Sequence, residues 1–303
     1  MDISVVIITY NQEEYIEQTL DSILKQDFDG EFEIIIGDDG SKDETRQILK
    51  QYSETYPEIV KPIFNEINLG IVRNYYNVIS HCTGKYIMVC GGDDYWLPGK
   101  MSAQFKVMEE NPSIGLCYGN AKKLMDGDES PLSEYVGGKS TTFSELMVEN
   151  KIPACTTCIR RETLVSYITE VDPVSHDWKM EDYPTWLWMS KNSAIYYMDK
   201  NISVYRILRN SASHKFDVDK RLDFYNSLFS VKRFFCEEYT ETLMTQEYNT
   251  LKSLYYLKGV KSFRTFSENY NLGIVKRDRV LCKIPFFLLI RNQLYLYAVR
   301  RMK

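Results

Sequence analysis

Residues 86–96 read YIMVCGGDDYW, and this stretch decides the fold that we predict. It opens with an apolar run, YIMVC, which is typical of a strand buried on both faces. Two glycines and two adjacent aspartates, Asp93 and Asp94, follow at once. Neighbouring carboxylates repel each other, and a carboxylate beside an apolar core is costly unless a positive charge meets it. The stretch therefore predicts a buried strand whose carboxyl end carries an acidic pair with a positively charged partner.

Strands of this kind alternate with helical patterns over the first 120 residues. Residues 3–9, ISVVIIT, form one such run, and residues 13–26 carry apolar positions at helical spacing. Alternating strands and helices predict an α/β fold with a mostly parallel, Rossmann-like central sheet flanked by helices. We expect Ser41 to be the N-cap of the second helix, with Glu44 completing a capping box. The other strands are predicted at 32–37, 60–64, 86–90 and 114–118, and the other helices at 41–56, 70–82 and from Pro98.

Polar clusters follow four of these strands at the point where each strand ends. Ligands of parallel α/β sheets bind outside the carboxyl ends of the strands. Because these ends meet at one edge of the sheet, the clusters predict a ligand site there. The clusters are Thr9-Tyr10-Asn11, Asp38-Asp39-Gly40-Ser41, Asn68-Leu69-Gly70 and Gly92-Asp93-Asp94.

The chemistry of these clusters suits a nucleotide. Tyr10 offers an aromatic face and Asp39 a carboxylate acceptor, which together describe a pocket for a flat heterocycle with an N–H group, such as uracil. Asn68 precedes a helix start that carries Arg73, a combination that suits a phosphate. The alternatives are a turn that caps the next helix at the Asp38–Ser41 cluster, and a capped helix with a surface arginine at 68–73.

The acidic pair suits a metal ion. Mg²⁺ and Mn²⁺ prefer hard oxygen ligands and complete their shells with phosphate oxygens and water. Such a dication would offset the repulsion between Asp93 and Asp94. The alternative is a solvated pair at a strand end, without an ion.

Composition limits the class of protein further. The chain has 303 residues and a net charge of −5, so it lacks the basic footprint of a nucleic-acid-binding protein and we expect no nucleic-acid partner. It has 7 cysteines, an odd number, and the first apolar run reads as a strand and not as a signal peptide. We therefore expect a cytoplasmic protein with free thiols. Cys155 and Cys158 have CxxC spacing but no second pair, which favours a structural role. No run reaches the ~18 apolar residues of a membrane span.

The remaining sequence is less regular. We expect a loop at 121–140, a helix near 177–191 and short strands near 195–206. From about Phe216 the pattern is helical. The predicted organisation is therefore one domain over 1–214, divided into halves at 1–120 and 121–214, followed by a helical C-terminal region at 215–303.

Four motifs in series resemble family 2 glycosyltransferases of the GT-A fold. They are SVVIITYNQEEYIEQTLDSILKQ, EIIIGDDGSKDET, NLGIVRNYYNVI and GKYIMVCGGDDYWLP, in the order and spacing of that family over roughly the first 120 residues. The resemblance implies an inverting transfer of a sugar, of the hexosyl type, from a nucleotide-diphosphate sugar, with UDP expected as the nucleotide. It also implies Mn²⁺ or Mg²⁺ as cofactor and a glycan or lipid-linked acceptor in cell-surface polysaccharide synthesis.

The resemblance also implies roles for individual residues. Tyr10 and Asp39 would hold the base, Asp93 would face the ribose or donor sugar, and Asp94 would bind the metal. His214, in the stretch YRILRNSASH, is a second candidate for the metal or pyrophosphate, and the alternative for this stretch is a surface loop. The expected donor-binding set is Thr9, Tyr10, Asn11, Asp38, Asp39, Asn68, Arg73 and Asp93, with Arg206 and Arg209 as further candidates for the diphosphate.

An inverting transfer needs a base for the acceptor hydroxyl. The resemblance implies that residues 1–120 form the nucleotide-sugar half of the domain and residues 121–214 the acceptor half. Within the acceptor half it implies that Asp182, in the stretch MEDYPTWLWM, is this base, with Glu181 and Trp186 on the acceptor side. The alternative for the tryptophan is an aromatic helix core, and His176 and Asp177 form a competing cluster nearby.

The sequence leaves two alternative functions open, and it allows two interpretations of residues 276–303. A nucleotidyltransferase would want a glycine-rich, basic loop after the first strand, and TYNQEEY has neither feature. A non-catalytic protein that only binds nucleotide sugars or joins a complex is the other alternative. Residues 276–303 mix basic and apolar side chains, which suits a helix on the inner face of an anionic membrane. Packing of that helix on the catalytic domain is the competing interpretation.

Overall fold

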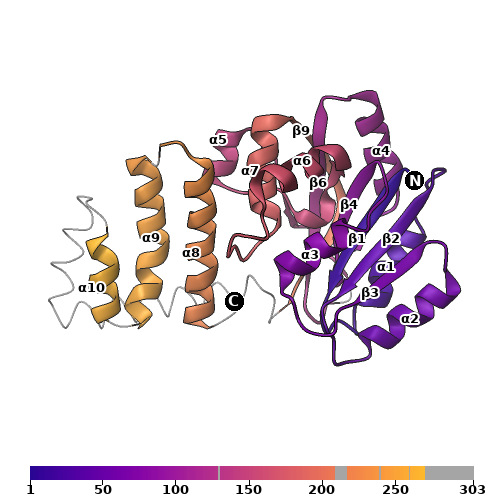
Figure 1. Cartoon of the computed structure of the whole chain (residues 1–303), viewed down its shortest axis with the longest axis horizontal. Coiled ribbons are helices and arrows are strands. Elements are labelled where there is room, and N and C mark those ends of the chain that lie inside the picture. Colours follow the sequence, from indigo (N-terminus) through magenta and orange to yellow (C-terminus); the bar gives the residue numbers. More distant parts are fainter. Residues whose placement is uncertain (129, 209–216, 239, 259, 270–303) are drawn as a thin grey trace. The chain divides into compact units, whose positions relative to one another are not determined.

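The computed structural model describes residues 1–128, 130–208, 217–238, 240–258 and 260–269 (Figure 1). The chain divides into two compact units, Met1–Arg209 and Asn210–Lys303, and each is described by itself. The domain boundary that we expect after residue 214 lies among residues outside this description.

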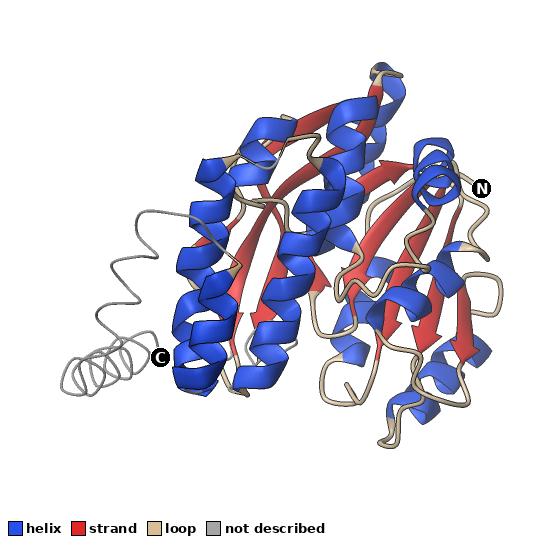
Figure 2. Ribbon diagram, turned by 60° about the vertical axis from the view of Figure 1, so that its left-hand side comes forward, coloured by secondary structure: helices blue, strands red, loops and turns tan. Residues whose placement is uncertain are grey.

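The first unit is built on one sheet of nine strands within the described residues, in the order β3-β2-β1-β4-β8-β6-β9-β5, with β7 paired to β6. The arrowheads of the parallel strands point toward one edge of the sheet (Figure 2). The strands are β1 (Ile3–Thr9), β2 (Phe32–Asp38), β3 (Val60–Phe64), β4 (Tyr86–Gly91), β5 (Tyr95–Trp96), β6 (Ile114–Met125), β7 (Tyr135–Val136), β8 (Cys158–Arg160) and β9 (Ala194–Ile207).

The α/β fold with helices around a central sheet is confirmed, and β3, β2, β1 and β4 are parallel neighbours. Their register brings Thr9 beside Asp38 and Ile8 beside Gly91, so the polar strand ends meet at one edge as expected. The later strands differ from a simple parallel series. The short β8 is antiparallel to both β4 and β6, and it separates them.

The prediction of a loop from residue 121 is wrong at its start. Strand β6 continues to Met125 because it pairs in parallel with β9 as far as Ile207. Its end is amphipathic: Ala121 and Leu124 are buried, and the two lysines between them are half-buried. The polar composition therefore hid a strand whose backbone groups are satisfied by a partner that is distant in the chain. Likewise, the short strands expected near 195–206 are one strand, β9.

Helices of the first unit cover the sheet, and several begin later than the sequence indicates. Helix α2 begins at Thr45 with Glu44 as its N-cap and has no side-chain cap, so the capping box at Ser41 is wrong. The Ser41 hydroxyl instead accepts a hydrogen bond from the Asn11 amide at 2.9 Å. The helices are α1 (Ile16–Leu24), α2 (Thr45–Thr55), α3 (Ile71–Ile79), α4 (Lys100–Glu110), α5 (Phe143–Val148), α6 (Arg161–Val171) and α7 (Asp182–Asn192), with a 3₁₀ turn η1 (Ala154–Thr156).

The core of the first unit lies between this sheet and α1, α2 and α4. Alternate residues of β1, β2 and β4 are fully buried with the apolar faces of these helices, as the continuous apolar runs predict. Cys158 belongs to this core, and both it and Cys155 are buried free thiols.

The second unit is helical over the described residues, as predicted for a C-terminal extension. Its helices are α8 (Val218–Phe235), α9 (Glu241–Lys258) and α10 (Val260–Glu268). They share an aromatic and aliphatic core that includes Phe229, Tyr248 and Phe263. Within the residues described, none of the helices has the length and apolar content needed to cross a membrane.

A buried carboxylate holds the amino-terminal edge of the sheet together. Glu33 on β2 accepts hydrogen bonds from Ser4 Oγ at 2.7 Å and from Thr83 N and Oγ1 at 2.8 Å each, and Lys61 Nζ lies 2.8 Å away. Burial opposes ionisation, but the hydrogen bonds from Lys61, Thr83 and Ser4 outweigh it and lower the pKa of Glu33 to about 2. Its charge therefore stabilises the folded chain.

We predict that Glu33→Gln lowers the free energy of unfolding by about 2 kcal/mol at pH 7, less than the full pKa shift would give because water reaches the Lys61 partner. A carboxyl with a depressed pKa gives its whole contribution above its unfolded value of 4.5 and loses it as the pH falls toward about 2. Urea unfolding from pH 2 to 7 should show the two proteins converging at the acid end. Glu31→Gln, at a residue 80% exposed, is the control and should change little.

Candidate functional site

Loops after β1 and β2 form the first part of the site. Tyr10 follows β1 and is 46% exposed, so its ring is open to a ligand. Asn11 has a φ of 52°, unusual for a residue other than glycine, and its side-chain Oδ1 accepts a hydrogen bond from Lys42 N at 2.8 Å. These contacts join the ends of the two strands and make Asn11 part of the loop framework.

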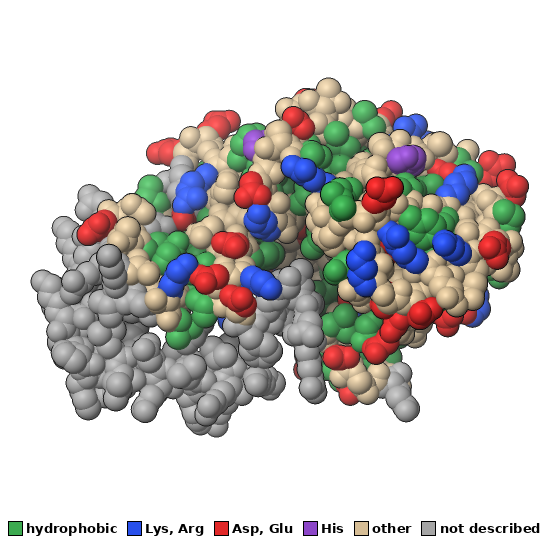
Figure 3. Space-filling model, turned by 60° about the horizontal axis from the view of Figure 1, so that its bottom comes forward, with side chains coloured by type: hydrophobic (Ala, Val, Ile, Leu, Met, Phe, Trp, Pro, Cys, Tyr) green, Lys and Arg blue, Asp and Glu red, His purple; other side chains and the backbone are tan. Residues whose placement is uncertain are grey.

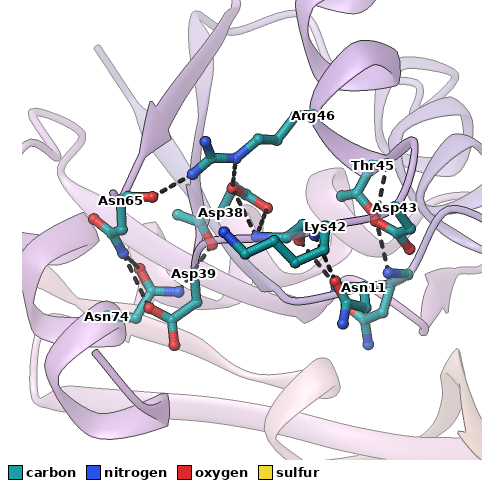
Figure 4. A network of polar contacts seen from close by, with 12 residues as sticks. Asn11, Asp38, Asp39, Lys42, Asp43, Thr45, Arg46, Asn65 and Asn74 are labelled. Carbon is teal, nitrogen blue, oxygen red and sulfur yellow. Dashed lines mark hydrogen bonds and ion pairs between the residues drawn. The ribbon is translucent and has the colours of Figure 1, made fainter. Parts of the chain in front are cut away.

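Asp38 is turned inward. Its carboxylate is fully buried. It accepts a hydrogen bond from Arg46 Nε at 2.6 Å and another from Ser41 N at 3.3 Å (Figure 4). An Arg–carboxylate pair with one buried member fixes the loop geometry. The contact between Asp38 and the donor that the sequence predicts is not supported by this arrangement, because the side chain has no exposed surface.

Asp39 organises the turn that precedes α3. Its Oδ1 accepts from Leu69 N at 2.7 Å and from Asn65 Nδ2 at 3.2 Å, and its Oδ2 accepts from Gly70 N at 2.9 Å. One lone pair of Oδ2 is left over by these contacts. The Asp39 carboxylate therefore shapes the loop and still has capacity for one further N–H donor.

Two asparagines connect this turn to the sheet. Asn65 Nδ2 donates to Asn74 Oδ1 at 2.9 Å, and Asn74 Nδ2 donates to Gly37 O at 2.8 Å (Figure 4). The sequence reasoning missed Asn65, although it directly follows β3 and the strand-end rule covers it. Asn68 and Arg73 are exposed on the same turn and on the first turn of α3.

The Asp93–Asp94 pair lies in a tight loop after β4. A Cβ placed on Gly91 would lie 3.0 Å from Asp93 Oδ1 and 3.2 Å from Asp94 Oδ2, so one oxygen of each carboxylate converges on the same place. The other Asp94 oxygen, Oδ1, accepts a hydrogen bond from Arg206 N at 2.9 Å. Asp94 is buried and Asp93 is half-buried.

Burial raises the pKa of Asp94 well above its usual range, and the charge of Asp93 adds to this effect. Burial also raises the pKa of Asp93, against the opposing attraction of Arg206. One buried and one half-buried carboxylate, both with raised pKa values, form a donor set that a divalent cation would stabilise. Among described residues there is no group of three or more Cys, His, Asp or Glu side chains placed to hold a metal, and His214 and Arg209 lie outside the description.

Gly92 and residues at and before helix α1 fix the conformation of this loop through close contacts. Thr9 is buried and donates from Oγ1 to Gln12 Oε1 at 2.8 Å, and a Cβ on Gly92 would lie only 2.7 Å from Thr9 Oγ1 and 2.3 Å from Gln12 Oε1. Thr19 Oγ1 donates to Asp94 O at 2.7 Å. Thr9 therefore contacts the acidic loop, and the helical residues of α1 that hold it were not found from sequence.

A second acidic pair begins α7. Asp182 Oδ1 accepts from Tyr183 N at 2.7 Å, and Glu181 O accepts from Thr185 Oγ1 at 2.7 Å. Burial, with the charge of Asp182 adding to it, raises the pKa of Glu181 to about 8, and burial raises that of Asp182. The Glu181 carboxyl therefore keeps its proton at neutral pH. Tyr76 Oη donates to Glu181 O at 3.4 Å, which links this turn to α3.

The aromatic and acidic neighbours of this pair have other partners. Trp186 is 1% exposed, so its ring is part of the helix core and shows no face to a sugar. His176 stacks on Trp178 with ring centroids 4.1 Å apart, and Asp177 pairs with Lys179 at 2.6 Å. The competing cluster that the sequence offers is therefore engaged in local contacts.

Figure 3 turns the lower side of Figure 1 toward the reader and shows acidic side chains beside Lys and Arg side chains on the first unit, so this face carries charges of both signs.

The fold and the strand-end loops together define a GT-A type α/β protein. The model of the family described as "Glycosyl transferase family 2" matches residues 4–168, which is more than half of the chain, so the chain belongs to this family. The resemblance that the four motifs indicate is thereby confirmed.

Relatives support the same assignment. The chain is 30% identical over 213 residues to a putative teichuronic acid biosynthesis glycosyltransferase, TuaG, of Bacillus subtilis, covering 70% of this chain and 81% of that one. It is 28% identical to the Escherichia coli UDP-Glc:alpha-D-GlcNAc-diphosphoundecaprenol beta-1,3-glucosyltransferase WfgD, in a match that covers 72% of this chain and 83% of that one. An uncharacterized Mycobacterium tuberculosis protein is 34% identical over 165 residues, which are 52% of this chain and 47% of that protein. The chain thus spans about half the length of that relative.

Solved structures share the fold. TarS 1–349 of S. aureus in complex with UDP matches with a TM-score of 0.57 at 20% identity, over 93% of this chain and 79% of that one. The mannosyltransferase PcManGT of Pyrobaculum calidifontis, in complex with GDP-Man and Mn²⁺, matches with a TM-score of 0.54 at 15% identity, over 96% and 86%.

We predict that Gly92→Ala disrupts the acidic loop selectively. The new methyl group would meet Thr9, a stiff β-branched side chain, so the loop after β4 has to move. UDP binding in the presence of Mn²⁺, measured by calorimetry, should weaken by about tenfold or more.

The matched control is Gly84→Ala, just before the same strand, where a Cβ would lie 2.3 Å from Ser4 N. It should lower the melting temperature at least as much and leave the UDP affinity of the folded protein unchanged. Equal UDP affinities in all three proteins would contradict the proposed tightness of the acidic loop.

Proposed function

We propose that this protein is a metal-dependent, inverting glycosyltransferase that uses a nucleotide-diphosphate sugar. The observation that carries the proposal is the convergence of Asp93 Oδ1 and Asp94 Oδ2 at Gly91, on the sheet edge that also holds the Asp39 turn. The family to which the chain belongs supports it. The relatives and solved structures suggest the donor and acceptor classes.

The donor would lie along the loops after β1, β2 and β4. Tyr10 would stack on the base, and the remaining lone pair of Asp39 Oδ2 would accept its N–H group. Asn68 and the exposed Arg73 lie at the start of α3, where N–H groups and a cation favour a diphosphate. Thr9, Asn11 and Asp38 would act by fixing these loops, and Asp93 would face the ribose or the donor sugar.

Asp94, with Asp93 beside it, would hold Mn²⁺ or Mg²⁺. The residues fit such an ion because these metals often take one or two carboxylates and complete their shell from phosphate oxygens and water. A bound dication would supply Lewis-acid stabilisation of the departing diphosphate. His214 is a further candidate ligand on sequence grounds alone. The PcManGT structure with Mn²⁺ makes a divalent metal plausible in this fold.

Asp182 would act as the base, because the neighbouring Glu181 carboxyl, with its pKa raised to about 8, keeps its proton at neutral pH. Its Oδ1 is held by Tyr183 N, which leaves Oδ2 for the proton of the acceptor hydroxyl. The acceptor oxygen then bonds to the anomeric carbon as the bond to the diphosphate breaks, and the proton remains on Asp182. A single displacement of this kind inverts the configuration at that carbon.

The substrate class is proposed from the relatives. The WfgD name specifies UDP-Glc and a diphosphoundecaprenol-linked acceptor, and the TarS structures contain UDP and UDP-GlcNAc. We therefore propose a UDP-hexose donor and a glycan or lipid-linked acceptor in surface polysaccharide synthesis. Action at the inner membrane face, with contact through 276–303, stays a prediction because those residues lie outside the description.

Thermal shift with a panel of UDP-, dTDP- and GDP-sugars plus Mn²⁺ tests the proposal. A ligand at a hundred times its dissociation constant adds about 2.7 kcal/mol to the folded state, so a true donor should raise the melting temperature. Asp94→Asn should keep the melting temperature of the ligand-free protein within a few degrees and lose both the Mn²⁺-dependent shift and sugar transfer. Stabilisation without donor hydrolysis or transfer would indicate a protein that only binds nucleotide sugars.

The carboxylate pair at α7 gives a separate prediction. Asp182→Asn should abolish transfer, whereas Glu181→Gln should retain it, because Glu181 is protonated below about pH 8. Rates measured from pH 5 to 9 should fall on the acid side in both wild type and Glu181→Gln, as Asp182 becomes protonated.

Stability provides a check on the same pair that does not need a substrate. A carboxyl with a raised pKa binds its proton more tightly in the folded state, so wild type should lose stability relative to Glu181→Gln as the pH rises from 4.5 toward 8. If Glu181→Gln is inactive and Asp182→Asn active, the roles are reversed.

A further inference from the structure

Arg206, near the end of β9, makes an unusual set of contacts with the acidic loop. Its backbone N–H donates to Asp94 Oδ1 at 2.9 Å and its side-chain Nε donates to Asp93 O at 2.9 Å. Its Nη2 donates to Gln18 Oε1 at 2.6 Å, and the guanidinium lies 4.6 Å from the centre of the Tyr15 ring. One residue therefore joins β9, the acidic loop and α1.

These contacts hold the acidic loop in one conformation. Arg206 N bonds to Asp94 Oδ1, while Asp94 Oδ2 and Asp93 Oδ1 both lie near Gly91. The Cys155 thiol also bonds to the Asp94 carboxylate, and the Gln12 side chain bonds to that of Asp93. The bond from Nε to the carbonyl of Asp93 fixes the peptide between the two acids. The guanidinium also places a positive charge beside a like-charged pair, which reduces their repulsion.

The side chain of Arg206 is 7% exposed, and its Nε and Nη2 groups donate within the protein. The sequence-based idea that it binds the diphosphate therefore does not fit this arrangement.

We propose that Arg206 is a positioning residue that sets the two metal-facing oxygens before the cation binds. The proposal rests on the proposed function, since it concerns the same acidic pair. Residues that orient metal ligands from behind typically change metal affinity by 10- to 100-fold when they are removed. Arg206 would thus act through Asp93 and Asp94 without touching the donor.

The test measures Mn²⁺ binding directly, by electron paramagnetic resonance with saturating UDP, in the full chain. Arg206→Ala keeps the backbone N–H that bonds to Asp94 Oδ1, but it removes the Nε bond to Asp93 O and the charge of the guanidinium. It should weaken Mn²⁺ binding by about tenfold or more. Arg206→Lys keeps the charge but cannot make both directional bonds, so it should recover only part of the affinity. In transfer assays, the Mn²⁺ concentration that gives the half-maximal rate should be lowest in wild type, higher in Arg206→Lys and highest in Arg206→Ala.

Arg160→Ala is the matched control. Arg160 is also 7% exposed, and it donates to Ile114 O, Met108 O and Tyr86 Oη, away from the acidic loop. It should lower the melting temperature without changing the Mn²⁺ affinity. Wild-type Mn²⁺ affinity in Arg206→Ala would overturn the positioning role.

If Arg206→Ala does not fold, Gln18→Ala decides the question. Gln18 is exposed, so its truncation removes one anchor of the Arg206 side chain with little effect on the fold. A severalfold loss of Mn²⁺ affinity supports the role, and an unchanged affinity overturns it. A wild-type protein that binds neither Mn²⁺ nor UDP would instead remove the proposed function itself.

Discussion

Two adjacent carboxylates at the end of a buried strand are the constraint on which the rest of the site depends. Burial and mutual repulsion both oppose the charges of Asp93 and Asp94. The glycines of the loop leave room for both carboxylates near Gly91. Thr19 of α1 and the Arg206 side chain bond to the backbone carbonyls of Asp94 and Asp93 and fix the loop. Each of these features makes sense as preparation for a cation, because a dication adds the charge that the protein alone supplies only in part.

Helix α3 connects the Asp39 turn with the acidic pair that begins α7. Near its start, Asn74 ties the Asp39 turn to β2, and shortly after it Tyr76 bonds to the carbonyl of Glu181. A single short helix thus contacts the framework of the nucleotide loops and the turn that begins α7. Rigid elements hold reacting groups more accurately than loops do, which suits a transfer between two bound substrates.

The sequence predicted the parallel half of the sheet and its polar edge well, because buried strands and strand-end clusters leave local signals. Asp93, Asp94 and Asp39 were singled out in this way, whereas the Glu181–Asp182 pair was singled out through the resemblance to the family. It could not reveal that Asp38 turns inward to Arg46, or that Arg206 reaches the acidic loop, since both depend on contacts between distant segments. The end of β6 was missed for the same reason: its pairing with β9 outweighs its polar composition.

The hydrogen-bond capacity of Asp39 has a consequence for nucleotide choice. Three N–H donors from the protein already use most of its acceptor sites, and the oxygen that remains can only accept. A uracil ring offers an imide N–H to such an oxygen, whereas the corresponding nitrogen of cytosine is itself an acceptor. Two acceptors facing each other in a partly dry pocket are strongly disfavoured. The same turn that shapes the loop would therefore discriminate between two pyrimidines of nearly equal size.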